Sequence, residues 1–155
     1  MCIRDSSGAL QDHKASWVLG RRSYGKGTVQ APIDFLGDKT VQKMTTIARF
    51  YQPSGRTNQV SGILPDFDVP SQPGKTEQLV EQREEDSYTN ALPPQGAPWV
   101  NPRAEEIKSI DQCRVDSVTG QDKAAQLFEK LKPNAVNLPD YQLLSAEVVL
   151  DCVTQ

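Results

Sequence analysis

The clearest pattern in the chain is an alternation of apolar and polar residues between positions 28 and 51. An apolar or small side chain recurs at every second position, at Val29, Ala31, Ile33 and Phe35 and again at Met44, Thr46, Ala48 and Phe50. This is the period of a β-strand, so we predict strands over 28–36 and 40–51, joined as a hairpin at Gly37-Asp38. Pro53–Arg56 then predicts a turn, and Gln59 to Asp68 a short strand with an extended run ending at Pro70.

Helical patterns occupy the start and the last third. Residues 6–14 are typical of the end of a helix whose apolar side carries Ala9 and Leu10. Pro102–Ile107 favours a helix start, because proline stands early and acids fill the first turn. Gln121 to Leu131 predicts a helix, with apolar residues at i, i+3, i+4 and i+7: Ala124, Leu127, Phe128 and Leu131. Asp140 to Cys152 is apolar over much of its surface, so we expect it to be buried or packed on another part of the protein.

A Pro-rich connection lies between these regions. Prolines, glycines and the acidic run Glu81–Asp86 concentrate between 71 and 102, a composition with little core of its own that permits a short helix around 76–86. We expect the acidic run to be solvated and Trp99 to anchor this connection on the body.

Composition narrows the classes of function. A net charge of −3 and a pI near 5.2 disfavour general affinity for nucleic acid or anionic membranes, and no apolar run approaches the length of a membrane span. His13 is the only histidine and no Cys-x-x-Cys occurs, so a zinc site has almost no ligands. Of the three cysteines, Cys113 and Cys152 could form a disulfide or remain two buried thiols; the residues leave both open.

The strongest candidate chemistry is a lysine between two glycines, Gly25-Lys26-Gly27. A turn of this kind suits phosphate binding, or an amine used as a general base. Gly20 to Lys26 fits G-x-x-x-x-G-K, but Gly27 stands where a P-loop needs Ser or Thr, and the residues that follow predict a strand rather than a helix. The general-base interpretation is therefore preferred.

Several further blocks surround this lysine: Ala9–His13, Val18–Gly20, Ser23–Gln30, Lys43–Thr45, Phe50–Tyr51, Pro53–Arg56, Gln59 and Gly62–Asp66, with a fainter echo at Asn90–Pro93. In this order and spacing, over about residues 8–70, they resemble the catalytic segment of the tail-specific (C-terminal processing) proteases. The resemblance implies peptide-bond cleavage by a serine–lysine dyad, without metal or nucleotide. It assigns Lys26 as the base and Gln30 as the glutamine that helps to position the dyad.

The chain departs from that family at its start. Aligned on Gln11-Asp12 and Lys26, the family's nucleophilic serine falls at Met1, and residues 1–6 resemble nothing in the family. We expect 1–6 to be a foreign start and the nucleophile to be missing. Ser6 and Ser7 lie too close to Gln11-Asp12 to share the nucleophile's helical face, so we expect them to cap the helix or face solvent. His13, with no acid positioned to orient it, is interpreted as a surface residue.

The sequence therefore predicts an α/β fold. The resemblance implies that residues 7–70 are the C-terminal part of a crotonase-like catalytic domain, and we expect 71–102 to be the Pro-rich connection and 103–155 a helical extension. By resemblance, the complete bacterial enzyme has an upstream PDZ domain and an export signal, works in the periplasm or another extracytoplasmic space, and binds protein or peptide substrates through their C-termini. Without the missing N-terminal half, we expect this chain to be inactive. The alternative is a non-catalytic protein-binding module, which requires Lys26 to be exposed and Gln30 to point away from it.

Overall fold

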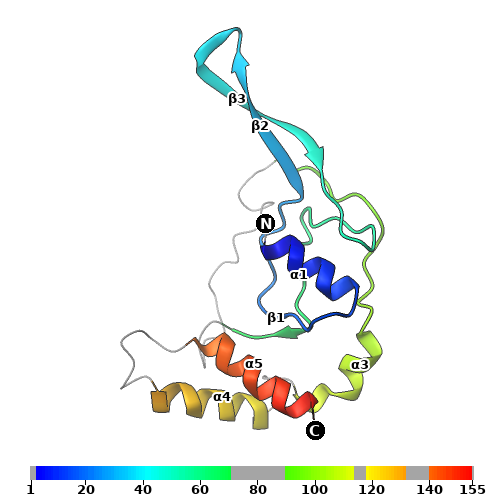
Figure 1. The fold of residues 1–155 in the computed structure, drawn as a ribbon, viewed down its shortest axis with the longest axis vertical. Coiled ribbons are helices and arrows are strands. Elements are labelled where there is room, and N and C mark those ends of the chain that lie inside the picture. The colour runs from blue at the N-terminus through cyan, green and yellow to red at the C-terminus, as the bar shows by residue number, and fades with distance from the viewer. Residues whose placement is uncertain (1–2, 71–89, 114–117, 132–139, 155) are drawn as a thin grey trace.

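The computed structural model describes residues 3–70, 90–113, 118–131 and 140–154. A two-stranded arm projects from one end, a pair of helices lies at the other, and a small body with a short parallel sheet connects them (Figure 1). The elements are α1 (Ile3–Asp12), β1 (Leu19–Gly20), β2 (Thr28–Phe35), β3 (Asp38–Arg49), β4 (Phe67–Asp68), α3 (Ala104–Ser109), the 3₁₀ turn η1 (Asp111–Cys113), α4 (Val118–Leu131) and α5 (Tyr141–Val153). The predicted mixture of helix and strand is confirmed.

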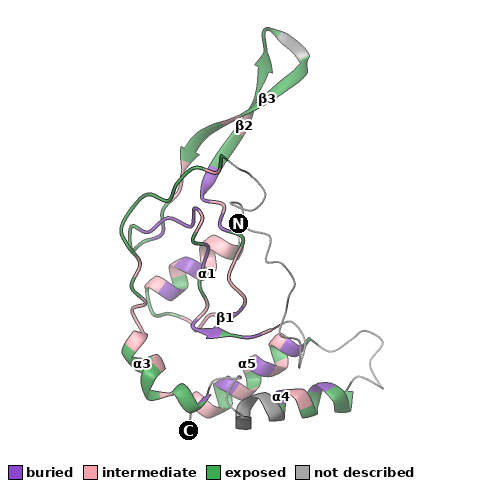
Figure 2. Ribbon diagram, turned by 180° about the vertical axis from the view of Figure 1, so that it is seen from behind, coloured by how far each residue is buried: buried purple, intermediate pink, exposed green. Residues whose placement is uncertain are grey.

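The arm is the predicted hairpin, with β2 and β3 antiparallel. Its turn falls at Leu36-Gly37, with φ of 53° and 80°, one residue earlier than predicted. Both residues take the left-handed backbone of the hairpin turns whose twist matches the strands. The register pairs Val29 with Ala48 but Gln30 with Thr46, so a bulge at position 47 interrupts the predicted alternation. Almost the whole arm is exposed (Figure 2).

The short sheet pairs β1 with β4 in parallel, Leu19 opposite Phe67. The strand predicted from Gln59 is wrong at its start: residues 59–61 form a turn in which Val60 has a φ of 65°. Only Phe67-Asp68 pairs as a strand, and Phe67 enters the core. That core joins the sheet to the C-terminal helices and comprises Phe67, Val69, Ala124, Phe128, Tyr141 and Val149.

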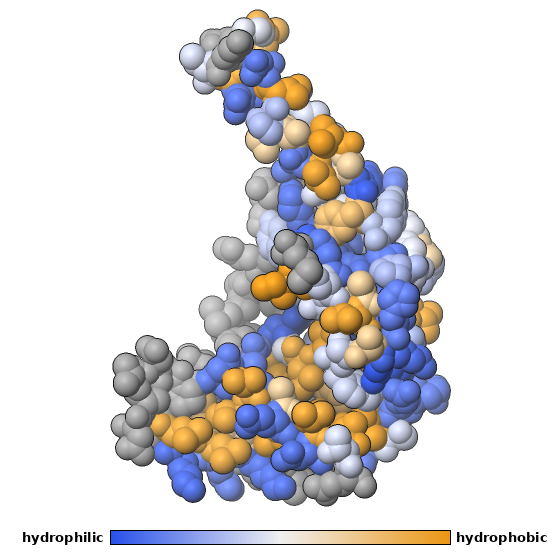
Figure 3. Space-filling view, in the orientation of Figure 1, coloured by the Kyte–Doolittle hydropathy of each residue, from blue (hydrophilic) through white to orange (hydrophobic). Residues whose placement is uncertain are grey.

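The C-terminal helices bury narrower faces than their apolar patterns predict. On α4, Phe128 is buried as expected, but Leu127 is 38 % exposed. Helix α5 begins where Asp140 accepts a hydrogen bond from the backbone N–H of Leu143, the usual role of an N-cap aspartate. Its buried face includes Tyr141, Ser145 and Val149, while Leu143 stands 62 % exposed. The space-filling view shows apolar residues on the outside of this helical end, among hydrophilic ones (Figure 3).

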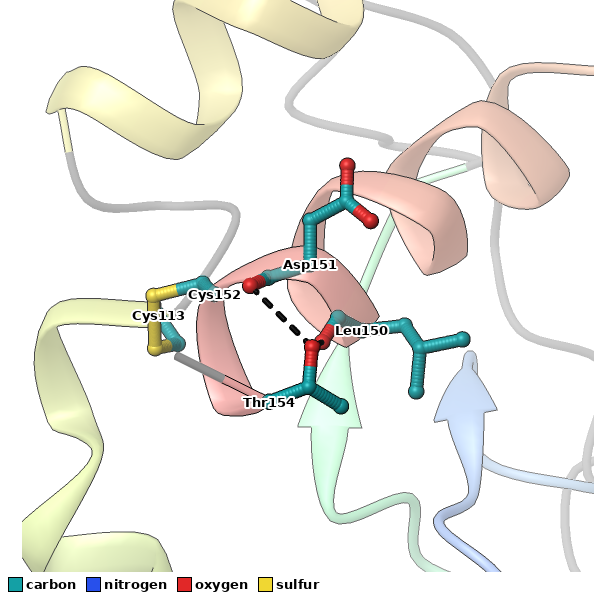
Figure 4. The surroundings of a disulfide bond; sticks show 5 residues. All are labelled: Cys113, Leu150, Asp151, Cys152 and Thr154. Atoms are coloured by element: carbon teal, nitrogen blue, oxygen red, sulfur yellow. Dashed lines mark hydrogen bonds between the residues drawn. A yellow bond between two sulfur atoms is a disulfide. The ribbon is translucent and has the colours of Figure 1, made fainter.

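A disulfide joins Cys113, at the end of η1, to Cys152 near the end of α5. Figure 4 shows it beside the last turn of α5, where the hydroxyl of Thr154 donates to the carbonyl oxygens of Leu150 and Asp151. The bond closes a 39-residue separation. It resolves the two possibilities that the sequence left open for these cysteines, and it fastens the C-terminal helix to the segment that follows α3.

The described end of the Pro-rich connection, residues 90–102, runs along the body, and we call it the strap. Trp99 anchors it as predicted: its indole N–H donates to Asp12 Oδ1 at 3.2 Å, and the Arg56 guanidinium lies 4.1 Å from its ring centroid. The expected short helix around 76–86 lies outside the described residues. No helix in the described part of the chain has the length and hydrophobicity that a membrane crossing requires.

Candidate active site

Lys26 is the second-last residue of the loop between β1 and β2, and Gln30 stands on β2. Their side chains meet: Lys26 Nζ donates to Gln30 Oε1 at 3.0 Å. Lys26 is partly buried, whereas Gln30 is exposed. The two residues assigned as base and positioning amide are therefore in direct contact.

The backbone after Lys26 continues into a strand. Gly27 precedes β2, which begins at Thr28. A P-loop would open a helix at this point and aim its N-terminal amides at phosphates. The local backbone is thus not that of a P-loop.

Gly25 and Gly27 let the Lys26 loop lie directly against the turn at 57–60. A side chain on Gly25 would bring its Cβ within 2.7 Å of the Val60 carbonyl oxygen, and one on Gly27 within 2.6 Å of the Gln59 nitrogen. Gly25 also has a φ of 95°, which favours glycine. The N–H of Val60 donates to the carbonyl of Gly25 at 2.7 Å. Both glycines flanking the lysine therefore serve close packing.

Gln59 completes this contact with its side chain. Its Oε1 accepts from the N–H of Gly27 at 2.8 Å, and its Nε2 donates to the carbonyl of Leu92 in the strap at 3.0 Å. The residue is 1 % exposed. Gln59 belongs to the blocks that carry the family resemblance, but its pattern in the sequence indicates no role, because a lone glutamine in a polar stretch has no periodicity to mark it as buried.

A second buried polar group lies behind the first helix. Arg56 Nη2 donates to Gln11 Oε1 at 2.9 Å and pairs with Asp12 Oδ1 at 3.0 Å. Gln11 Nε2 in turn donates to Asp66 Oδ1 at 3.0 Å. Burial lowers the pKa of Arg56 from its ordinary value, although Asp12 and then Asp66 act to raise it. This group ties α1 to the segment 56–66 on which the Lys26 loop rests.

The buried group corrects the prediction for α1. Leu10, expected on the packed side, is 46 % exposed, and the buried residues of this helix are Gly8 and Gln11. A Cβ on Gly8 would lie 2.7 Å from the side chains of both Gln52 and Ile63. The face of α1 that meets the body is therefore selected by close approach and polar pairing rather than by hydrophobicity.

The other candidate residues lie as follows. The hydroxyl of Ser7 donates to the carbonyl of Ile3 one helical turn earlier, and His13 is exposed directly after α1, as predicted. Met1, where the resemblance places the nucleophile, is outside the described residues. Within the ranges that the structure describes, no three His, Cys, Asp or Glu side chains gather as metal ligands do.

Comparison with known proteins identifies the class to which this segment is related. Residues 5–69, which hold most of α1, the Lys26 loop, the arm and β4, match the model of Peptidase family S41. The resemblance to tail-specific proteases is confirmed, and by that resemblance the chain is related to peptidases.

Three curated relatives show how far the similarity extends. The chain is 46 % identical over 63 residues to a carboxy-terminal-processing protease of Bartonella bacilliformis, covering 41 % of this chain and 14 % of that protein. It is 26 % identical over 149 residues to a tail-specific protease of Haemophilus influenzae, covering 90 % of this chain and 19 % of that protein. A chloroplastic C-terminal processing peptidase of Tetradesmus obliquus is 33 % identical over 63 residues, covering 41 % of this chain and 13 % of that protein. The chain thus spans less than a fifth of each.

Proposed function

We propose that this chain is part of a serine endopeptidase of the tail-specific, C-terminal processing type, and that Lys26 and Gln30 are the base and the positioning amide of its serine–lysine dyad. The observation that carries the proposal is the 3.0 Å contact between Lys26 Nζ and Gln30 Oε1. It lies inside the segment that matches Peptidase family S41. The relatives' names agree with a protease.

The proposed chemistry uses the amine to move one proton twice. An unprotonated lysine amine takes the proton of a serine hydroxyl as the oxygen bonds to the carbonyl carbon of the substrate. The resulting ammonium gives that proton to the leaving nitrogen as the peptide C–N bond breaks. Because Gln30 Oε1 accepts one N–H of the amine, it limits the directions in which the nitrogen can present its lone pair or its other protons.

The serine itself is proposed to be absent from this chain. The resemblance places it at Met1, and a methionine thioether has no proton to give up and cannot replace a hydroxyl. We therefore propose that the chain alone does not cleave peptide bonds. Residues 7–70 contribute the lysine part of a crotonase-like catalytic domain, 71–102 the connection, and 103–155 a helical extension.

By the same resemblance, the substrates are proteins or peptides bound through their C-termini. The complete enzyme works in the periplasm or another extracytoplasmic space of a bacterium. Neither metal nor nucleotide takes part in the proposed reaction.

A non-catalytic protein-binding module is the other candidate. It calls for an exposed Lys26 and a Gln30 that points elsewhere. The partial burial of Lys26 and its hydrogen bond to Gln30 support the enzyme instead.

A chimera tests the proposal. Residues 7–69 of this chain replace the matching stretch of the Bartonella bacilliformis protease, which keeps the host's own serine region, and cleavage of an unstructured protein is followed by gel electrophoresis. We expect the chimera to cleave, and Lys26→Ala to lower the rate by about a thousandfold or more, as loss of a base that activates a nucleophile does. Gln30→Ala should lower it by about tenfold or more, because positioning is lost.

The matched control is Lys43→Ala, which removes an exposed lysine of β3 and should leave the rate unchanged. A folded chimera that does not cleave, or one whose rate survives Lys26→Ala, contradicts the assignment.

A further inference from the structure

We propose that Gln59 is the positioning residue of the Lys26 loop and that the strap holds the Gln59 amide in its working orientation. The inference rests on the proposed function of Lys26 and adds a residue and a segment to which that function assigns no role.

Gln59 holds the peptide unit that joins Lys26 to Gly27. The N–H that Gln59 Oε1 accepts, at 2.8 Å, belongs to Gly27, and this N–H shares its peptide plane with the carbonyl of Lys26. Fixing the N–H therefore fixes the backbone rotation on the C-terminal side of Lys26. The carbonyl of Gly27 is held as well, by the N–H of Phe50 at 3.2 Å.

The backbone on the N-terminal side of Lys26 is held as well. The carbonyl of Gly25 accepts from the N–H of Val60 at 2.7 Å. Lys26 is thus bracketed by two bonds to neighbouring residues of one turn, Gln59 and Val60. The Val60 bond is made by backbone alone. The Gln59 bond is made by a side chain, so substitution of Gln59 can remove it without changing any residue of the Lys26 loop.

The strap fixes which way the Gln59 amide faces. A glutamine amide has one accepting and one donating end, and a flipped amide would present N–H to N–H. Gln59 Nε2 donates to the carbonyl of Leu92 at 3.0 Å. This bond can form only in the amide orientation in which Oε1 faces the N–H of Gly27. Because Gln59 is 1 % exposed, water cannot readily replace either partner.

The strap is itself held close to this point. The N–H of Ala97 donates to the carbonyl of Gly55 at 3.1 Å, and Asn101 Nδ2 donates to Asp66 Oδ1 at 2.7 Å. A Cβ on Gly96 would lie 2.5 Å from the Gly55 carbonyl oxygen, which shows how closely the strap backbone approaches the body. These contacts fix the strap on the body, and with it the position of the Leu92 carbonyl that accepts from Gln59.

The test compares Gln59→Met with Gln52→Met in the full chain. Gln52 is also a buried glutamine, at 5 % exposure, and it lies against Gly8 of α1 rather than against Gly27. Two quantities are measured under native conditions: hydrogen exchange of the Gly27 amide by NMR, and acetylation of Lys26 by mass spectrometry, relative to acetylation of Lys108.

We expect Gln59→Met to speed exchange at Gly27 by about five- to tenfold, the effect of losing one hydrogen bond. The same variant should change the relative acetylation of Lys26 by about threefold or more, because the amine is no longer held in one place. Gln52→Met should change neither. If both quantities stay at their original values in Gln59→Met, or shift equally in Gln52→Met, the proposal is overturned.

Gln59→Glu keeps an acceptor for Gly27 and loses the donor to Leu92. It should preserve slow exchange at Gly27 and speed it at Ala97 in the strap; unchanged exchange at Ala97 contradicts the role of the strap. If Gln59→Met does not fold, this variant carries the test: exchange at Gly27 that is faster by about fivefold or more, although an acceptor is kept, overturns the proposal.

The chimera separates this inference from the proposed function. If the Lys26→Ala chimera still cleaves, the proposed function is overturned, whatever the result for Gln59. If that chimera does not cleave, but hydrogen exchange at Gly27 and acetylation of Lys26 are unchanged in Gln59→Met, only the role of Gln59 is overturned.

Discussion

Replacing Arg56 by methionine probes the buried ion pair that joins α1 to the segment carrying the Lys26 loop. The side chains of Arg56 and Asp12 are 4 % and 2 % exposed, and their charged atoms are 3.0 Å apart. Methionine keeps much of the aliphatic volume of arginine and removes the charge. Asp12 then retains the N–H of Ser54 and the indole N–H of Trp99, but no cation.

The magnitude follows from two opposing effects. At this separation the Coulomb attraction is about 5 kcal/mol for an effective dielectric constant of ~20. Desolvation of both groups offsets much of it, and the pKa of Arg56 is lowered because burial outweighs the two carboxylates. Removing one member leaves the other charge buried without its partner. We therefore expect Arg56→Met to lower the free energy of unfolding by about 3–5 kcal/mol, including about 1 kcal/mol from lost contact with the Trp99 ring.

Urea unfolding at neutral pH, followed by tryptophan fluorescence, measures this change, and Asp12→Asn completes a double-mutant cycle. In the Arg56→Met background, Asp12→Asn should raise the free energy of unfolding by about 1–3 kcal/mol, because it removes the uncompensated charge. In the original chain the same substitution should lower it. Lys108→Met, which breaks an exposed pair with Glu105, should change stability by less than about 0.5 kcal/mol. Equal effects of Asp12→Asn in both backgrounds would refute the coupling.

Three further predictions concern the arm and the helical end. Leu36→Asn should stabilise the chain by about 1 kcal/mol in urea, because Leu36 is 90 % exposed with a φ of 53°, and asparagine adopts that backbone at lower cost; a loss of stability contradicts this. Reduction of the Cys113–Cys152 disulfide should lower the free energy of unfolding by about 4 kcal/mol for its 39-residue separation, and an unchanged urea midpoint in dithiothreitol argues against it. Burial raises the pKa of Tyr141 above 10.0, so the stability it contributes is full below that pH and is lost as the pH rises through the raised pKa. Tyr141→Phe should therefore lose less stability than the original chain between about pH 8 and about pH 11, while Tyr51→Phe, at an exposed site, should behave like the original.

The elements that depend on local pattern were predictable. The alternation over 28–51 marked the arm, and the apolar spacing around Phe128 marked α4, because periods of 2 and 3.6 residues are visible in sequence. Boundaries moved by a few residues where the ends depend on turn geometry. The turn fell at Leu36-Gly37, where leucine accepts a left-handed backbone that its side chain disfavours.

The parts that depend on long-range polar contacts could not be predicted. Gln11, Arg56 and Gln59 are among the most deeply buried residues, yet polar residues are usually read as exposed. Their polar groups are hydrogen-bonded to partners as many as 55 positions away, as in the bond from Gln11 to Asp66. A local periodic pattern in the sequence cannot indicate such distant partners. The disulfide was undecided for the same reason, since cysteine spacing does not specify pairing.

The candidate site shows the same division. The glycines around Lys26 and the strand period that carries Gln30 predicted an amine at a fixed turn, and the resemblance supplied the roles. The reason for the glycines, close packing against Gln59 and Val60, appeared only in three dimensions.

The most direct test of the central claim asks whether an amine at position 26 is what cleavage needs. Residues 7–69 contain no cysteine, so Lys26→Cys in the chimera introduces one thiol into the grafted segment, and bromoethylamine converts it to a side chain ending in an amine like that of lysine. Cleavage should be lost in Lys26→Cys and recovered after aminoethylation, with the unsubstituted chimera given the same reagent as the control. Cleavage by the unmodified cysteine variant at the original rate, or none after complete aminoethylation of folded protein, would contradict the assignment of Lys26 as the base.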